Sequence, residues 1–256
     1  MGRGFSRWRW SRAGVLALAA GCAAALAAGA KEPSPEERFP IRLIQGEKTE
    51  AARFFLEDYT LFRERRTEFR STLKVYAYLF ARLPLASDMI RALKIGKHKI
   101  TEGPDGAYLI DTGSGVTGRF WIVHSGKGRK VIYGEGGYSG WLIRNLGGRA
   151  SFAIAYTPAR TDRGLVMKNH LMVFVKVDNV IVDFLIKSLD WMIRLLVRAQ
   201  ISQASSAAQK LTEAIAREPE KVYERLEKSL RIPTSALKAF RARFPGGRNK
   251  GLKNSD

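Results

Sequence analysis

The segment LMVFVKVDNVIVDFLIKSLDWMIRLLV, residues 171–197, contains the strand and the helix on which this fold depends. Leu171, Val173 and Val175 alternate with other residues and fall on one face of a strand, while Lys176 falls on the other. From Val180 onward the apolar residues recur with the period of a helix, which we predict to extend to residue 216. The segment therefore predicts a strand followed directly by a helix of about ten turns.

The first half of this predicted helix is apolar around most of its circumference. Asp183, Lys187, Asp190 and Arg194 are spaced by four, three and four residues, so they form a single narrow polar stripe. A helix with so little polar surface has to be nearly enclosed by other parts of the protein. A strongly twisted sheet wrapped around the helix would enclose it in this way.

The region between residues 100 and 178 has the pattern of antiparallel hairpins with one buried face. Short stretches rich in Gly and polar residues, such as HSGKGRK and PARTDRG, separate the apolar runs and predict the connections. The predicted strands are AYLID (107–111), GRFWIVH (118–124), RKVIYGEG (129–136), ASFAIAYT (150–157) and LVMKNHLMVFVKVD (165–178).

Upstream of the hairpins we predict a short first strand over residues 39–44 and a long amphipathic helix over residues 49–83. Aromatic residues spaced by three, four and seven, among them Phe55, Tyr59 and Phe62, support the helix, which Pro84 would end. After Pro219 we predict two short helices, 219–230 and 234–244, followed by a disordered basic tail. Residues 218–256 thus form a helical extension with a tail.

Taken together, the stretches GVTGRFWIV, GRASFAIAYTP, LMVFVKVDN and VIVDFLIKSLDWMIRLLV resemble the helix-grip pattern of the START-like, or SRPBCC, superfamily. The resemblance covers about residues 39–217, and it implies an α+β fold in which a curved antiparallel sheet wraps around a long C-terminal helix. The START-like domain would occupy residues 49–217. The helix predicted over residues 49–83 is longer than the resemblance implies and would be an addition.

The resemblance also implies a cavity for a lipid or another hydrophobic small molecule between the sheet and the helix. Large apolar side chains should line it, although the same residues are equally consistent with a solid core. We expect no catalytic residue, metal or cofactor. The predicted ligand-binding residues are Phe120, Ile122, Val131, Tyr133, Phe152, Ile154, Tyr156, Phe184 and Trp191.

The N-terminus has the organisation of a secretory leader over residues 1–30. A basic start, MGRGFSRWRWSR, is followed by the apolar run AGVLALAAGCAAALAAGA, which ends in the small residues Ala28, Gly29 and Ala30. Residues 31–48 would then comprise a polar linker and the short first strand. Two alternatives stay open: the apolar run is retained as a membrane anchor, or Cys22, which follows a sequence similar to a lipobox, is lipidated. We predict an exported protein of the periplasm or cell envelope.

The chain is strongly basic, with 44 Lys+Arg against 24 Asp+Glu and a net charge of +20. Such a charge favours anionic partners. Because export separates the protein from nucleic acid, we expect the partner to be an anionic membrane surface. The sequence leaves the oligomeric state open.

Residues 111–118 match two short motifs at once. Asp111 to Ser114, DTGS, is typical of an aspartic protease, and Gly113, Gly115 and Gly118 fit G-x-G-x-x-G. The β-branched and aromatic residues after Gly118 predict a strand rather than the helix that binds a pyrophosphate. A retropepsin-like enzyme using Asp111 would need a dimer to supply the second carboxylate. This protease and a structural envelope protein without a ligand are the two alternatives to a binding protein.

Overall fold

The computed structural model describes residues 39–44, 49, 58–126, 128–140, 146–162, 164–178 and 182–245, and for residues 182–193 it describes the backbone only. The chain divides into two compact units, Met1–Ser34 and Pro35–Asp256, and every described residue belongs to the second. The architecture below is that of the second unit.

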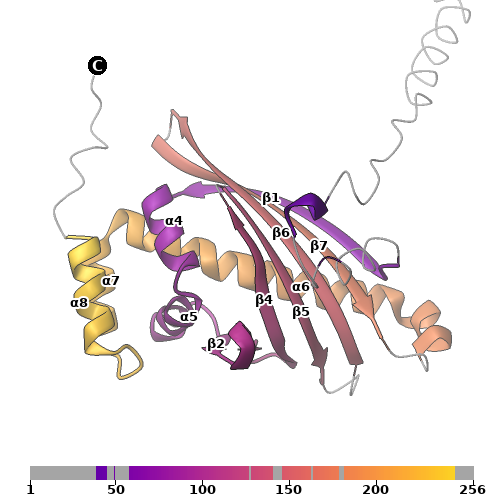
Figure 1. Ribbon diagram of the computed structural model, residues 1–256. Coiled ribbons are helices and arrows are strands. Elements are labelled where there is room, and N and C mark those ends of the chain that lie inside the picture. The colour runs from indigo at the N-terminus through magenta and orange to yellow at the C-terminus, as the bar shows by residue number, and fades with distance from the viewer. Residues whose placement is uncertain are drawn as a thin grey trace, which may run out of the picture. The chain divides into compact units, whose positions relative to one another are not determined.

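A seven-stranded antiparallel sheet forms the centre of the unit, with the strand order β1-β7-β6-β5-β4-β3-β2 (Figure 1). All five strands predicted between residues 100 and 178 are present, and a sixth, β2, pairs with β3 at one edge. The strands are β1 (Leu61–Arg70), β2 (Lys99–Glu102), β3 (Tyr108–Asp111), β4 (Val116–Gly126), β5 (Arg129–Tyr138), β6 (Leu146–Thr161) and β7 (Gly164–Val177).

The prediction of a helix over residues 49–83 is wrong for Leu61–Arg70, which forms strand β1. Leu61 and Phe69 are buried on one face, and the strand pairs with β7 along its whole length, from Leu61 opposite Val175 to Arg70 opposite Val166. The hydrogen bonds offered by the free edge of β7 override the helical spacing of the aromatic residues. Residues 50–57 of the predicted helix lie outside the described part of the chain.

The prediction of a strand over residues 39–44 is wrong. This segment contains a single 3-10 turn, Ile41–Leu43 (η1). Phe39 and Ile44 are buried against Val131, Ala153 and Phe174 on one side of the sheet. The segment therefore packs across the sheet through its apolar side chains and does not pair with it as an eighth strand. We call the side of the sheet that it covers the outer face.

The opposite side, which we call the helix face, is crossed by the long helix α6, Val182–Arg217 (Figure 1). Its bounds agree closely with the helix predicted from residue 180 to 216. Helix α4, Leu73–Phe80, covers one end of the helix face, where Tyr76 packs against Phe69 and Tyr156. The α+β helix-grip architecture predicted from the sequence is thereby confirmed.

Helix α5, Leu83–Ala92, follows α4 after a short break. Pro84 lies in the first turn of α5, where its missing N–H costs nothing, and it does not end a longer helix. Ser87 lies inside this helix, where its Oγ donates a hydrogen bond to the Pro84 carbonyl and accepts one from the Ile100 amide. This contact ties α5 to β2.

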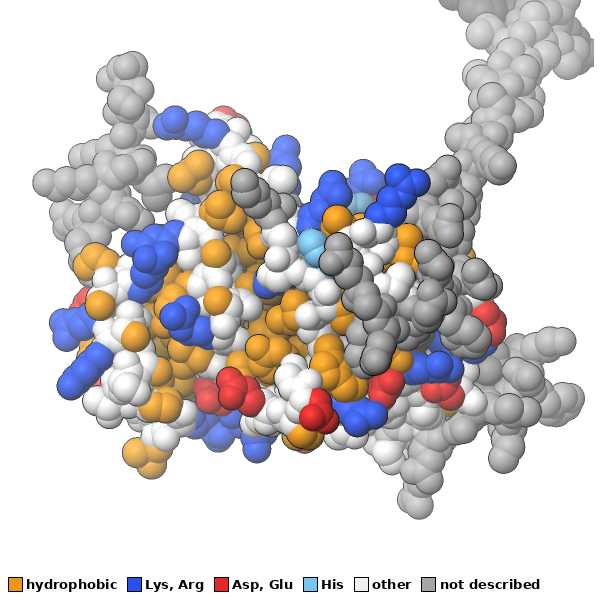
Figure 2. Space-filling model, viewed as in Figure 1, with side chains coloured by type: hydrophobic (Ala, Val, Ile, Leu, Met, Phe, Trp, Pro, Cys, Tyr) orange, Lys and Arg blue, Asp and Glu red, His pale blue; other side chains and the backbone are white. Residues whose placement is uncertain are grey.

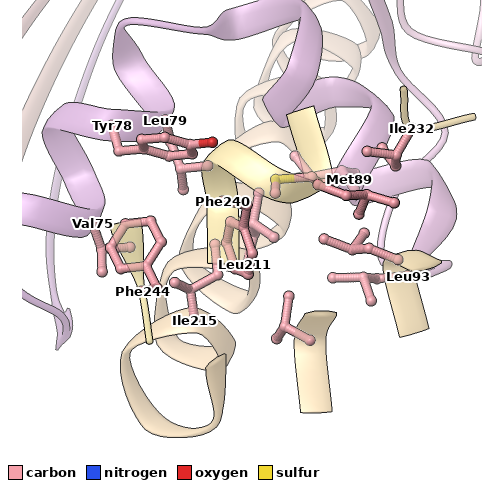
Figure 3. Close-up of a cluster of buried hydrophobic side chains, with 14 of the residues drawn as sticks. Val75, Tyr78, Leu79, Met89, Leu93, Leu211, Ile215, Ile232, Phe240 and Phe244 are labelled. Atoms are coloured by element: carbon pink, nitrogen blue, oxygen red, sulfur yellow. The ribbon is translucent and has the colours of Figure 1, made fainter. Parts of the chain in front are cut away.

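The C-terminal helices α7 (Pro219–Glu227) and α8 (Thr234–Arg243) pack against α4, α5 and the end of α6. Together these helices enclose a continuous apolar core, which we call the helical cluster (Figure 3). At its centre Met89, Leu226 and Phe240 are each 0% exposed. The predicted helical extension is therefore part of the packed structure up to Phe244.

Candidate ligand-binding site

Glycines at three adjacent positions shape the middle of the sheet. Gly118 on β4 lies opposite Gly136 on β5, which lies opposite Gly148 on β6. A Cβ at Gly136 would come within 2.4 Å of the Thr117 carbonyl oxygen, and one at Gly118 within 2.4 Å of the Glu135 oxygen. Glycine therefore allows the strands to approach this closely, and the row presents no side chain to the helix face.

Five of the predicted ligand-binding residues share the helix face. The strand register aligns Phe120 and Ile122 on β4 with Phe152, Ile154 and Tyr156 on β6, through the β5 residues between them. Phe120 stacks on Tyr108, and Tyr156 packs against α4. The alternation of the strands thus brings together the apolar side chains that the sequence singled out.

Several apolar side chains of the helix face are only partly buried, although the face lies under α6. Phe152 on the interior strand β6 is partly exposed, whereas its neighbours Ser151 and Ala153, on the outer face, are only 1% and 2% exposed. A closely packed core would bury a phenylalanine on an interior strand before a serine. The partly exposed apolar residues of the helix face are Ile122, Ile132, Phe152, Ile154, Leu171 and Val175.

Val131 and Tyr133 do not join this group, and their predicted placement is wrong. Counted back from the two-residue loop, a regular ladder would pair Ile122 with Tyr133, but a β-bulge at Val123 pairs Ile122 with Ile132 instead. The extra residue turns Val131 and Tyr133 to the outer face. There Val131 lies beneath Phe39 and Ile44, and burial together with a hydrogen bond to Glu135 raises the pKa of Tyr133 to about 12.

Phe184 and Trp191, the other two predicted residues, lie in the part of α6 whose side chains are outside the described part of the structure. The backbone of α6 continues past them to Gln200, which contacts the turn between β3 and β4 through Ser114.

Lys130 is a polar residue of the helix face that sequence reasoning missed. It is 8% exposed, and it pairs with Ile154 across β5 and β6. Its Nζ donates to Ser125 Oγ at 2.8 Å and lies 5.5 Å from the centre of the Phe80 ring. Burial lowers the pKa of Lys130. Because Lys130 is separated from Ile132 by one residue, the corrected register would have revealed it.

Other polar groups lie on the same face nearer to the edge strand β1. Asn169 on β7 pairs with Tyr156 and Thr67, and its Oδ1 is buried without a hydrogen-bond partner among the described residues. Arg63 and Arg65 share the face of Leu61 and Phe69. Sequence reasoning could not place them, since it assigned this segment to a helix.

Asp111 is the last residue of β3, and its carboxylate accepts a hydrogen bond from the Gly113 amide, in the turn that follows, at 2.8 Å. Gly113 and Gly115 have positive φ values, 65° and 99°, as a tight turn requires. Gly118 lies within strand β4, and no helix follows it, which agrees with the strand predicted from the sequence. Both motifs of this stretch are thus accounted for by a β-hairpin turn.

Among the described residues, no group of three or more His, Cys, Asp or Glu side chains is arranged to hold a metal ion. Within the same part of the chain, no helix combines the length and the apolar character needed to cross a membrane.

No protein-family model matches this chain, and no curated protein is significantly similar to it. Solved structures with a similar arrangement are a conserved protein from Geobacillus kaustophilus (15% identity, TM-score 0.44, covering 60% of this chain and 97% of the other) and truncated norcoclaurine synthase from Thalictrum flavum (15%, 0.37, 60% and 94%). The di-domain ARO/CYC BexL is similar over 61% of this chain and 50% of its own, with 13% identity and a TM-score of 0.38.

Proposed function

We propose that this chain binds a lipid or another hydrophobic small molecule between the helix face of the sheet and α6. The observation that carries the proposal is the partial exposure of apolar side chains such as Phe152 and Ile154 beneath a helix. Apolar surface left accessible there is stabilised by an apolar ligand, which removes it from water. The activity is sequestration or transport, without a chemical step.

Uptake of a fluorescent fatty acid by the purified, delipidated chain tests this proposal. We expect saturable binding with fluorescence typical of an apolar environment, and mass spectrometry of the undelipidated protein should find a lipid released by organic solvent. A chain that takes up no probe and releases no lipid contradicts the proposal and favours the structural envelope protein.

The variant Asp111→Asn separates binding from proteolysis. Since Asp111 is exposed and accepts a hydrogen bond within its own turn, the variant should bind the fatty acid as the parent chain does. Proteolysis at acid pH that disappears in the variant would instead favour the aspartic protease.

We further propose that the protein is exported and acts at an anionic membrane. The leader-like residues 1–30 and the net charge of +20 support this part of the proposal. Figure 2 shows one face of the described structure, on which Lys and Arg side chains lie to the left and upper right of an apolar centre and Asp and Glu side chains lie along its lower edge. Flotation with vesicles should show binding to phosphatidylglycerol-containing membranes and not to phosphatidylcholine alone, and salt should weaken it. Fractionation of cells with N-terminal sequencing tests export and cleavage.

A further inference from the structure

Lys130 places a charged group within an apolar part of the helix face. Its neighbours in the sheet ladder are Ile154 on β6 and Ser125 on β4, and the ring of Phe80 from α4 lies over its Nζ. The side chain is more than nine-tenths buried. Its ammonium group has therefore lost most of its contact with water.

This buried ammonium lacks a counter-ion in the described part of the chain. Its contacts there are the hydrogen bond to the Ser125 hydroxyl and the face of Phe80, and no carboxylate lies within ion-pair distance. An ammonium group has three donors, so two are left for another partner. Burying an unpaired charge costs stability, which makes such a residue a candidate for ligand binding.

Lys130 is at one end of the apolar helix face. Along β5 it is followed on the same face by Ile132 and Gly134, and then by Gly136 in the glycine row. Gly136 follows Lys130 by six positions along the strand, a length of about 20 Å. An extended apolar chain that starts at Lys130 would run past Ile154 and Phe152 toward the glycine row.

We propose that the ligand is an amphiphile with a carboxylate head group, which pairs with Lys130 while its apolar chain lies along the helix face. This inference rests on the proposed function and names the class of ligand. A single ammonium matches the single negative charge of a carboxylate, and the Ser125 hydroxyl beside it can rotate to donate a second hydrogen bond.

The test compares three probes of equal chain length on the full, delipidated chain: a naturally fluorescent polyene fatty acid, its methyl ester, and an alkyl phosphate that competes with the fatty acid. Each is measured on the parent chain, on Lys130→Met, and on Lys130→Arg. Lys168→Met serves as the matched control, because Lys168 is exposed on the outer face of β7. Circular dichroism verifies that each variant is folded.

The parent chain should bind the acid more tightly than the ester by roughly ten- to a hundredfold, the range of a charge-assisted hydrogen bond. Lys130→Met should bind acid and ester equally, with the affinity for the ester unchanged. Lys130→Arg should keep part of the preference for the acid, and Lys168→Met should keep all of it. Equal binding of acid and ester, unchanged in Lys130→Met, overturns the inference and leaves the proposed function intact. Tighter binding of the phosphate overturns the carboxylate assignment. Failure to bind either fluorescent probe overturns the proposed function itself.

Discussion

The helical cluster and the helix face are both apolar, but they are packed differently. In the cluster, Phe240 and Leu226 are 0% exposed, and side chains from five helices close around them. On the helix face, Phe152 and Ile154 remain partly exposed on the interior strand β6. Protein interiors are normally packed as densely as organic crystals. The cluster follows this rule and holds the unit together, whereas the helix face leaves apolar surface accessible, as the proposed ligand would require.

The two regions also differ in the kind of polar group that they bury. Beside the helical cluster the buried polar groups are uncharged: the Ser87 and Thr212 hydroxyls donate to backbone carbonyls, and the Tyr78 hydroxyl has no partner among the described residues. On the helix face, by contrast, Lys130 places a charged ammonium group in a buried position. Since burying a charge without a counter-ion costs stability, the position of Lys130 favours the proposed ligand-binding surface.

The largest effect should come from Phe240→Ala, which removes the centre of the helical cluster. The ring packs against Tyr78 and Phe244, and its removal leaves a cavity that the surrounding helices cannot fill. We expect the free energy of unfolding to fall by about 3–5 kcal/mol, measured by urea denaturation. A loss below about 1 kcal/mol would contradict close packing in this cluster.

Gly136→Ala should have the next largest effect, because it puts a methyl group into the glycine row. The new Cβ would lie 2.4 Å from the Thr117 oxygen, so β4 and β5 would have to separate. We expect a loss of roughly 2 kcal/mol in unfolding free energy and weaker fatty-acid binding. Gly147→Ala is the matched control: no atom lies within 4 Å of its added Cβ, and it should change stability by less than about 0.5 kcal/mol.

Phe152→Ala tests the helix face directly and should cost less than Phe240→Ala. A partly exposed ring contributes less burial, so we expect a loss of about 1–2 kcal/mol in unfolding free energy. Binding of the fluorescent fatty acid should weaken at the same time, which Phe240→Ala should not cause in the folded fraction. Equal stability losses in the two variants would indicate that the helix face is a solid core.

The two regions also differ in how far the sequence predicts them. The strands of β4 to β7 and helix α6 follow from local alternation and helical periodicity, which depend on neighbouring residues. The face on which each strand residue lies depends on the bulge at Val123, which reverses the orientation of Val131 and Tyr133. No local pattern marks this bulge, so five predicted site residues share the helix face and two do not.

Strand β1 illustrates a different limit of sequence reasoning. Its aromatic and basic residues are compatible with a helix when they are considered alone. Its strand conformation comes from pairing with β7, more than 100 residues later in the chain. The position of Arg63 and Arg65 on the helix face therefore follows from this pairing and could not be inferred from the sequence.

Lys130→Met should have the smallest effect and the opposite sign. Burial lowers the pKa of Lys130 from the ordinary value of 10.5, so the unfolded chain holds this proton to higher pH than the folded one. The cost of burying the charge is complete at neutral pH, declines as the pH rises through the folded-state pKa, and is gone above the unfolded value. Ser125 and Phe80, the described groups that contact Nζ, carry no compensating charge.

We therefore expect Lys130→Met to be more stable than the parent chain by roughly 1 kcal/mol at pH 7, with the difference shrinking toward pH 11. Urea denaturation at several pH values measures it, and Lys168→Met should show no such gain. If Lys130→Met is instead less stable at pH 7, the contacts of Lys130 with Ser125 and Phe80 stabilise the fold. The helix face would then resemble the helical cluster in being built for stability. A gain in stability accompanied by the loss of acid binding would support the proposed carboxylate site, because Lys130 would then weaken the free protein and strengthen the complex.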